Sequence, residues 1–146
     1  MMKRLRLMML FALMNVAVFA QETEVTNGAQ IEFDKLIHEY GEVIYDGDGI
    51  CYFEFKNTGN APLIISDATG SCGCTVPSYP KEPIAPGQSA TITVKYNTKK
   101  PGAINRTVTI TSNAVNESIA VLRVKGNVLA KPAPTTPIDT SGAPVK

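Results

Sequence analysis

The sequence lacks tryptophan, has one histidine, and keeps all five methionines within its first fourteen residues. A Ser-His-Asp triad or a Cys-His dyad could use only His38 as its base, and nothing in the sequence places that residue beside a nucleophile. The chain also contains no Gly-rich phosphate loop, no His-Glu-x-x-His and no Gly-x-Ser-x-Gly. These absences argue against the common hydrolases and phosphate-binding enzymes, and we interpret His38 as a structural residue. We expect no cofactor.

The chain is also short and carries little net charge. A chain of 146 residues is long enough for one ordinary domain with one core. Charged residues make up 18% of the chain and the formal net charge is +1. This balance excludes a highly charged disordered chain and a basic nucleic-acid binder.

Residues 1–20 have the layout of a secretory signal peptide. Lys3, Arg4 and Arg6 precede an apolar run over residues 7–19, and small residues lead to a cleavage site between Ala20 and Gln21. The run of about 13 residues is short for a membrane span, which needs roughly 20. We therefore expect an exported chain, periplasmic or extracellular, whose mature form does not insert into a membrane.

The mature chain favours β-structure. Beyond residue 20 there are 22 valines and isoleucines but only four leucines, a β-branched excess typical of strands. Cleavage removes three of the fourteen basic residues and leaves eleven against thirteen acidic ones, a net charge of about −2. Neither nucleic acid nor an anionic membrane surface is an expected partner.

Apolar and polar residues alternate with period two, which predicts strands with one buried face. The predicted buried sets are Cys51, Phe53 and Phe55; Ala90, Ile92, Val94 and Tyr96; Ile104, Val108 and Ile110, interrupted by Arg106; and Ala120, Leu122 and Val124. Short strands without a helical window predict an all-β chain, folded as an antiparallel β-sandwich rather than a barrel, over residues 30–130. Residues 21–29 are predicted to be a flexible lead-in, and the Pro/Thr-rich residues 131–146 a disordered or extended tail.

The residue types at two positions predict turns. Asn57-Thr58-Gly59-Asn60 predicts a hairpin between the strand at residues 50–57 and a strand at residues 63–65. Asp46-Gly47-Asp48-Gly49 resembles part of a calcium loop, but the ligand spacing and the closing glutamate are absent, so we predict a tight turn.

Several motifs together resemble the bacterial domain of unknown function 1573 family. They are Asn57-Thr58-Gly59-Asn60-Ala61-Pro62-Leu63, Ser71-Cys72-Gly73-Cys74-Thr75, Ala85-Pro86-Gly87-Gln88, Thr111-Ser112-Asn113 and the lead-in His38-Glu39-Tyr40-Gly41. The resemblance covers residues 31–128. It implies a secreted protein of Bacteroidetes with an immunoglobulin-like fold similar to the ASPM/SPD-2/Hydin and PapD-like sandwiches. It implies little about activity, because a fold does not fix a function.

Three cysteines in an exported chain leave at least one thiol outside any intramolecular disulfide. The predicted hairpin puts Cys51 near Asp67, and so within reach of Cys72 and Cys74. In the structural interpretation, Cys51 bonds Cys72 or Cys74, or is simply a small core residue. The alternatives are a soft-metal site for an ion such as Cu(I), and a redox site in which Gly73 gives access and Cys72 bonds Cys74. The family pattern does not require Cys51.

The leading hypothesis is a non-catalytic module that binds a protein partner or gives structural support in the bacterial envelope. Its expected working surfaces are a loop over residues 68–82 and any exposed strand edge. The alternative is a thiol-based redox or Cu(I)-handling protein that uses Cys72 and Cys74. A third possibility, by analogy with PapD-like sandwiches, is a chaperone-like protein that binds an extended peptide along an edge.

Overall fold

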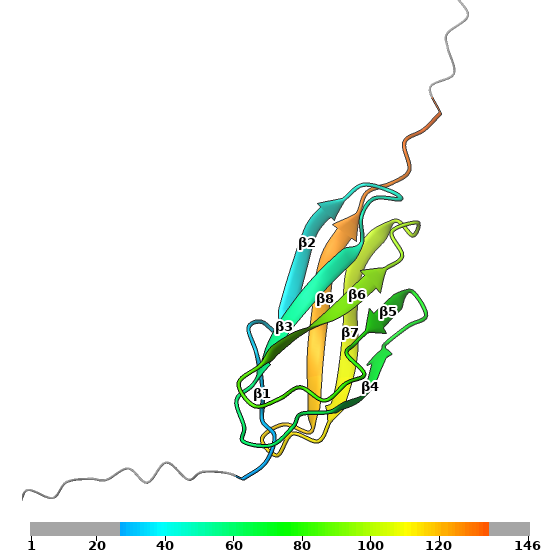
Figure 1. Cartoon of the computed structure of the whole chain (residues 1–146). Helices are drawn as coiled ribbons and strands as arrows, with labels where there is room; N and C mark the ends of the chain where they lie inside the picture. The colour runs from blue at the N-terminus through cyan, green and yellow to red at the C-terminus, as the bar shows by residue number, and fades with distance from the viewer. Residues whose placement is uncertain (1–26, 135–146) are drawn as a thin grey trace, which may run out of the picture.

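A computed structural model describes residues 27–134, which form eight strands in two four-stranded sheets (Figure 1). One sheet has the order β1(Ile31–Phe33), β3(Ile50–Asn57), β6(Ser89–Tyr96), β5(Thr75–Ser78), and the other has the order β2(Ile37–Val43), β8(Ile119–Val128), β7(Gly102–Ser112), β4(Ile65–Gly70). The fold is an immunoglobulin-like β-sandwich, as predicted. The expected signal peptide, its Ala20–Gln21 junction and most of the proline-rich tail lie outside the described residues.

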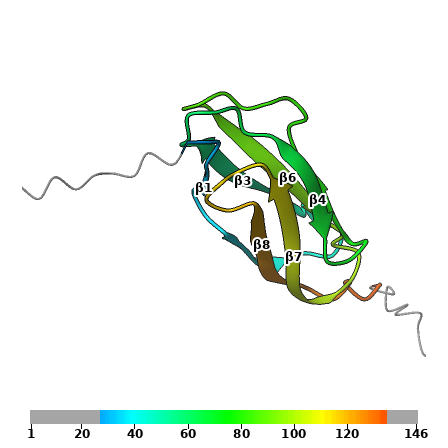
Figure 2. The same cartoon turned by 90° about the horizontal axis from the view of Figure 1, so that it is seen from below.

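The core lies between the two sheets, which pack face to face (Figure 2). In β3 the burial alternates strictly, and Cys51, Phe53 and Phe55 are each at most 1% exposed. The predicted buried sets of the later strands also face inward. The largest fully buried side chains include Phe53, Phe55, Leu63, Ile92, Ile110 and Leu122. The period-two pattern therefore identified the core correctly.

The first strands close one side of the sandwich. β1 pairs with β3 in one sheet, and after a short crossing β2 pairs with β8 in the other. The β2–β8 pair is parallel, whereas every other strand pair is antiparallel, so the expectation of a purely antiparallel sandwich holds except here. The register of β2 shifts between Glu39 and Glu42, where Gly41 has a φ of 65°. Glycine adopts this left-handed conformation at no steric cost, which lets β2 bend along β8.

The predicted hairpin after β3 is wrong. β3 pairs with β1 and β6, Leu63 forms an isolated bridge with Ile84, and Ile65 begins β4 in the opposite sheet. The physical reason lies in the contacts of Asn57, whose Nδ2 donates hydrogen bonds to the carbonyls of Ala61 (2.8 Å) and of the distant Ile84 (2.9 Å). Pro62 has no N–H with which to pair back onto β3. The chain therefore crosses to the second sheet.

Asparagine side chains fasten the loops at the end where the described chain begins. Asn116 Oδ1 accepts a hydrogen bond from Ile31 N (3.0 Å), and its Nδ2 donates to Ile31 O (2.8 Å). Asn113 in the same way accepts from Ile64 N (2.8 Å) and donates to Pro62 O (3.1 Å). Each amide satisfies a backbone donor and acceptor as a neighbouring strand would.

The described chain enters and leaves the sandwich at opposite ends of its long axis (Figure 1). The asparagine-fastened loops occupy the end where it enters. The other end carries the turn of residues 44–49 and the segment after β8. Within residues 27–134 we find no helix long and apolar enough to cross a membrane.

Candidate functional site

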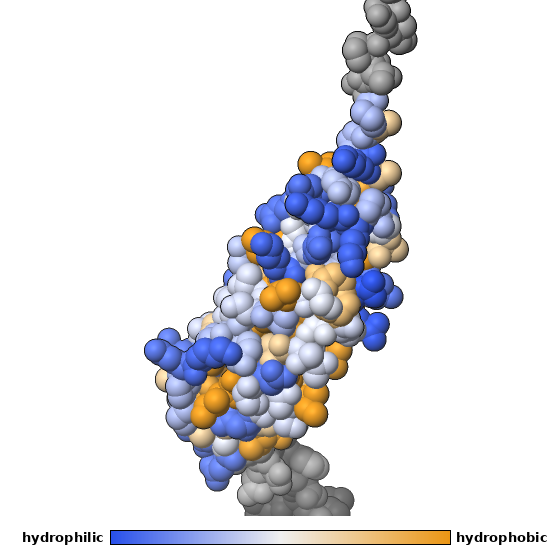
Figure 3. Space-filling view, turned by 90° about the vertical axis from the view of Figure 1, so that its right-hand side faces the viewer, coloured by the Kyte–Doolittle hydropathy of each residue, from blue (hydrophilic) through white to orange (hydrophobic). Residues whose placement is uncertain are grey.

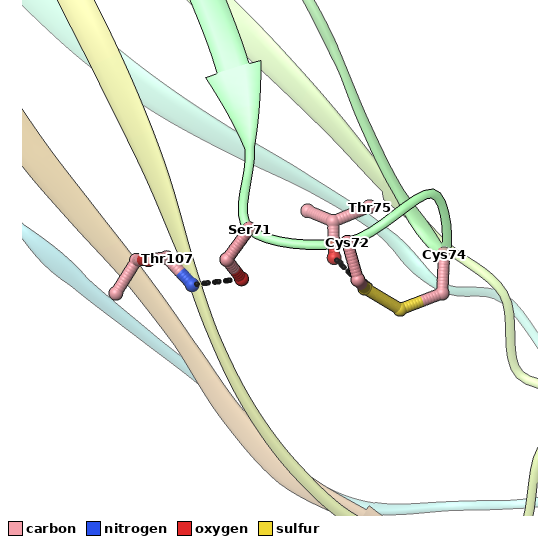
Figure 4. Close-up of a disulfide and its surroundings, with 5 residues drawn as sticks. All are labelled: Ser71, Cys72, Cys74, Thr75 and Thr107. Carbon is pink, nitrogen blue, oxygen red and sulfur yellow. Dashed lines mark hydrogen bonds between the residues drawn. A yellow bond between two sulfur atoms is a disulfide. The ribbon is translucent and has the colours of Figure 1, made fainter.

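The Cys-Gly-Cys segment forms the connection between β4 and β5. The expected long loop over residues 68–82 is wrong in extent, because β4 continues to Gly70 and β5 occupies Thr75–Ser78. The segment leaves β4 beside β7, where Ser71 N donates to Thr107 O (2.8 Å) and Thr107 N donates to Ser71 Oγ (3.1 Å; Figure 4). This reciprocal pair fixes the first residue of the connection.

Backbone contacts also fix the far side of the connection. Thr75 N donates to Cys72 O (3.1 Å), and Asn97 N donates to Cys74 O (2.8 Å). A Cβ on Gly70 would collide with the carbonyl oxygen of Thr75, so only glycine permits this close approach. The path of residues 70–75 is thus set by its own backbone contacts and by those to β7 and the chain after β6.

Cys72 and Cys74 are joined by a disulfide, with their Cα atoms 5.3 Å apart (Figure 4). Cys51 is a free, buried thiol on β3, opposite Val94. The expectation that all three sulfurs come together is wrong, because it depended on the hairpin that does not form. Within residues 27–134, no group of three or more His, Cys, Asp or Glu side chains is arranged to hold a metal ion.

Thr75 is the polar side chain next to the disulfide. It is buried, and its Oγ1 lies 3.6 Å from Cys72 Sγ and 3.9 Å from Cys74 Sγ (Figure 4). A hydroxyl at these distances can donate a hydrogen bond to either sulfur. A donor in this position favours the charged form of a thiol.

The Cys51 thiol lies in an apolar site with Tyr40 nearby. Burial raises the pKa of Cys51 above its usual range, with the Tyr40 hydroxyl as a smaller opposing influence. Burial also raises the pKa of Tyr40, whose hydroxyl donates to Gly49 O (2.6 Å). Both groups are therefore neutral at physiological pH.

His38 packs as an aromatic ring. Its ring centroid lies 4.7 Å from that of Tyr40 and 6.3 Å from that of Phe53. Burial, followed by the positive charge of Lys35, lowers the pKa of His38. Lys35 Nζ lies 3.3 Å from His38 Nδ1. These contacts bring no nucleophile to the imidazole.

A cleft of about 740 Å³ opens beside the Cys-Gly-Cys segment. Its walls come from the turn before β3, the segment itself, β5, and the end of β6 with the residues after it. The lining residues are Asp46, Gly47, Asp48, Gly49, Ile50, Gly73, Cys74, Val76, Lys95, Tyr96, Asn97, Thr98 and Lys99. The cleft thus combines apolar side chains with charges of both signs.

The polar groups of the turn at residues 46–49 bond to neighbouring residues of this chain. Asp48 Oδ1 accepts from Ile50 N (2.9 Å), and Thr98 Oγ1 donates to Gly47 O (2.7 Å). Asp46 adopts a φ of 61° and forms an exposed ion pair with Lys99 (3.5 Å). These contacts are those of a tight turn that braces one wall of the cleft.

Two apolar side chains beside the cleft face outward. Ile50 is 39% exposed and Val76 is 59% exposed, and both pair with Lys95 on β6 from opposite sides. The sequence interpretation missed both residues, although each is an apolar residue at an outward position of its strand. It also missed Thr75, for which the sequence carries no signal beyond its place after Cys74.

The edge strands of both sheets are short or irregular. β1 has three residues, β5 has four and contains Pro77, and β4 shifts register between Ile65 and Asp67. Such features limit pairing with a further strand. On the side that carries β4 and β5, apolar groups are scattered among polar ones, and hydrophilic residues gather towards the end where the chain leaves (Figure 3).

The fold and this end of the molecule define an immunoglobulin-like sandwich in which the described residues assemble no catalytic group. The chain belongs to the family described as protein of unknown function (DUF1573), whose profile matches residues 31–128. The resemblance inferred from the sequence motifs is confirmed. No curated protein matches the chain.

Solved structures share the fold at low sequence identity. The PapD-like domain 7 of human CEP192, an ASH domain, has a TM-score of 0.60 and 7% identity, over 82% of this chain and 99% of that one. A protein of unknown function from Porphyromonas gingivalis W83 has a TM-score of 0.59 and 17% identity, over 70% of this chain and 48% of that one. The periplasmic chaperone SfaE has a TM-score of 0.50 and 11% identity, over 71% of this chain and 60% of that one.

These likenesses show the fold alone. This chain spans about half the length of the Porphyromonas gingivalis protein. Together the family and the neighbours give an immunoglobulin-like domain of unknown function.

Proposed function

We propose that this chain is an exported, non-catalytic module that binds a protein partner in the bacterial envelope. The observation that carries the proposal is the cleft at the disulfide end, where Ile50 and Val76 expose apolar surface on both sides of Lys95. Apolar groups surrounded by polar and charged ones are typical of protein interfaces.

The walls of the cleft suit a polypeptide partner. Besides the Asp46–Lys99 ion pair, Asp48 and Lys95 lie around the same opening, so it can pair with charges of either sign on a partner. The cleft walls are tied together by backbone hydrogen bonds, including Asp46 N to Thr98 O (3.2 Å) and Tyr96 N to Gly49 O (2.8 Å). A braced surface of this kind loses little conformational freedom on binding.

Three observations support an envelope location and a binding role. Residues 1–20 have the layout of a signal peptide. The periplasmic chaperone SfaE shares the fold. The described residues bring no nucleophile to the single histidine, whose ring packs against Tyr40 and Phe53. We place the module itself at residues 30–130.

The test compares Val76→Asp with Val121→Asp in the mature chain. Val121 lies on β8 in the other sheet and is 45% exposed, so its substitution adds the same charge at a distant surface. Each variant is cross-linked to native envelope extract, and the captured protein is then purified and its affinity measured. We expect Val76→Asp to weaken binding tenfold or more, since a hot-spot anchor contributes about 2 kcal/mol or more, and Val121→Asp to leave binding unchanged.

Equal capture by both variants would place the interface elsewhere. If the captured protein, once purified, binds neither the native chain nor the Val121→Asp control, the proposed binding role is refuted.

A further inference from the structure

We propose that Cys72 and Cys74 form a reversible dithiol–disulfide site that exchanges with a dithiol of another envelope protein. This activity goes beyond the proposed binding role. It is inferred from one juxtaposition: a disulfide at the rim of a cleft, with a buried hydroxyl next to both sulfurs, in a segment whose shape does not depend on the S–S bond.

The disulfide adds little constraint to the fold. It joins residues separated by two positions, so it closes the smallest of loops and removes little entropy from the unfolded chain. The segment is already held by Ser71 and Thr107 on one side and by Asn97 on the other. We therefore expect the sandwich to stay folded when the bond is reduced.

The disulfide is open to attack from the cleft. Gly73 and Cys74 form part of the cleft wall. A Cβ placed on Gly73 would meet no atom within 4 Å, so the space around Gly73 is open. Cys74 is half-buried against the core and also lines the cleft, so we expect an incoming thiolate to reach its Sγ from the cleft.

The leaving sulfur has a hydrogen-bond donor in place. Thr75 Oγ1 is nearer to Cys72 Sγ, at 3.6 Å, than to Cys74 Sγ. If Cys74 is attacked, negative charge develops on Cys72, and the Thr75 hydroxyl stabilises it. Thiols that leave as stabilised thiolates leave faster.

A positive charge lies on the neighbouring strand. Arg106 pairs with the buried Val124, so it faces the interior of the sandwich, and its buried Nε has no hydrogen-bond partner among the described residues. Its chain neighbour Thr107 bonds Ser71, which precedes Cys72. Ser71 and Thr107 thus tie the Cys-Gly-Cys segment to the strand that carries Arg106.

The exchange balances as follows. A thiolate of the partner dithiol attacks Cys74 Sγ, the Cys72–Cys74 bond breaks, a mixed disulfide forms, and Cys72 leaves as a thiolate that takes a proton from solvent. The second thiolate of the partner then attacks the partner's first sulfur, which is bonded to Cys74 in the mixed disulfide. Cys74 is released as a thiolate and is also protonated. Two electrons pass from the partner, which becomes a disulfide, to this chain, which becomes a dithiol.

The primary test equilibrates the mature protein with mixtures of reduced and oxidised glutathione and then traps thiols under native conditions. The buried Cys51 should escape native trapping, and a Cys51→Ala variant removes it altogether. We expect Cys72 and Cys74 to interconvert at a measurable glutathione ratio, with the same circular dichroism spectrum in both states. A pair that resists excess dithiothreitol until the protein unfolds, or that is found as two free thiols after aerobic purification, would overturn the proposal.

The role of Thr75 is tested by Thr75→Val, which keeps the shape of the side chain but removes the hydroxyl. The rate of reduction by dithiothreitol should fall about tenfold, since hydrogen bonds to charged groups are among the stronger ones. Thr75→Ser should restore most of the rate, and Thr91→Val, an exposed threonine on β6, should leave it unchanged. Equal rates for Thr75→Val and the native chain would remove Thr75 from the mechanism.

Discussion

Cys51 is the one free cysteine among residues 27–134, and its side chain is 1% exposed. Burial raises the pKa of its thiol. We predict that iodoacetamide labels Cys51 very slowly in the native protein at pH 8 and completely after denaturation, because both access and thiolate are lacking in the fold. Mass spectrometry of the labelled peptide measures the outcome.

The raised pKa of Cys51 also determines how the free energy of unfolding changes with pH. Above the ordinary pKa of cysteine, the unfolded chain has released the Cys51 proton while the folded chain retains it. The contribution of Cys51 to the free energy of unfolding is therefore complete below the ordinary pKa of cysteine, and it is lost as pH rises through the raised pKa of the folded chain.

For the labelling prediction, rapid reaction of Cys51 with iodoacetamide at pH 8 in the native protein would show that the thiol is accessible in the fold.

Arg106 is an ionic residue in an apolar stripe between Ile104 and Val108. Its unpartnered Nε carries an unrecovered desolvation cost. We predict that Arg106→Met stabilises the protein by about 1 kcal/mol, or roughly 5 °C in Tm for a domain of this size. Thermal unfolding followed by circular dichroism tests this.

Arg123→Met is the matched control for Arg106→Met. Arg123 is exposed on β8, so its removal should change Tm by no more than about 2 °C. A clear loss of stability in Arg106→Met would mean that the guanidinium is stabilising where it stands. The expected gain would instead mark Arg106 as a residue retained at a cost to stability.

At the scale of elements, one side chain organises the crossing from β3 to β4. Asn57 is fully buried; its Nδ2 donates to Ala61 O and Ile84 O, and its Oδ1 accepts from Gly59 N (3.0 Å) and Gln30 N (3.3 Å). We predict that Asn57→Ala costs about 3 kcal/mol, because several backbone groups lose their partners in a buried site. Urea denaturation measures the difference.

Asn127→Ala serves as the comparison for Asn57→Ala. Asn127 is exposed near the end of β8, and its substitution should leave the urea midpoint nearly unchanged. If both variants unfold at the native midpoint, the Asn57 network contributes nothing to stability.

The strands themselves could be predicted from the sequence, but their partners could not. Alternation along residues 50–57 and 89–96 shows which side chains face inward, because the period of a strand is a local property. Pairing depends on contacts far apart in the chain. The chain does not form a hairpin after Asn57, because Asn57 bonds Ile84, 27 residues away, and because Pro62 has no N–H.

The same limit explains the candidate site. The Cys-Gly-Cys block stands out in the sequence by residue type alone. The cleft beside it is built from segments before β3, around β5 and after β6, and the separation of Cys51 from the other two cysteines follows from sheet pairing. A local sequence pattern predicts neither the cleft nor the position of Cys51 relative to the other cysteines.

For the whole molecule, we predict that residues 27–131 fold as an independent unit. The last backbone hydrogen bond of the described chain joins Leu129 N to Val43 O (2.8 Å), and beyond it Lys131 Nζ lies 5.8 Å from the Tyr45 ring centroid. The fragment should match the stability of residues 21–146 within about 0.5 kcal/mol, because it retains the core and the loop contacts.

Urea denaturation of both chains measures this difference. A loss of more than about 1 kcal/mol in the fragment would mean that residues outside 27–131 pack against the sandwich.

The parallel pairing of β2 with β8 also bears on how the molecule responds to force. The described chain enters at one end of the long axis and leaves at the other (Figure 1). Tension between its ends therefore acts first on β1, which is paired with β3, and once β1 is released it pulls β2 by its start and β8 by its finish. The hydrogen bonds between these two strands lie across the direction of pull and are loaded in shear together. An antiparallel hairpin pulled at its open end would release its bonds one at a time. The sandwich therefore carries a tensile load through many bonds at once.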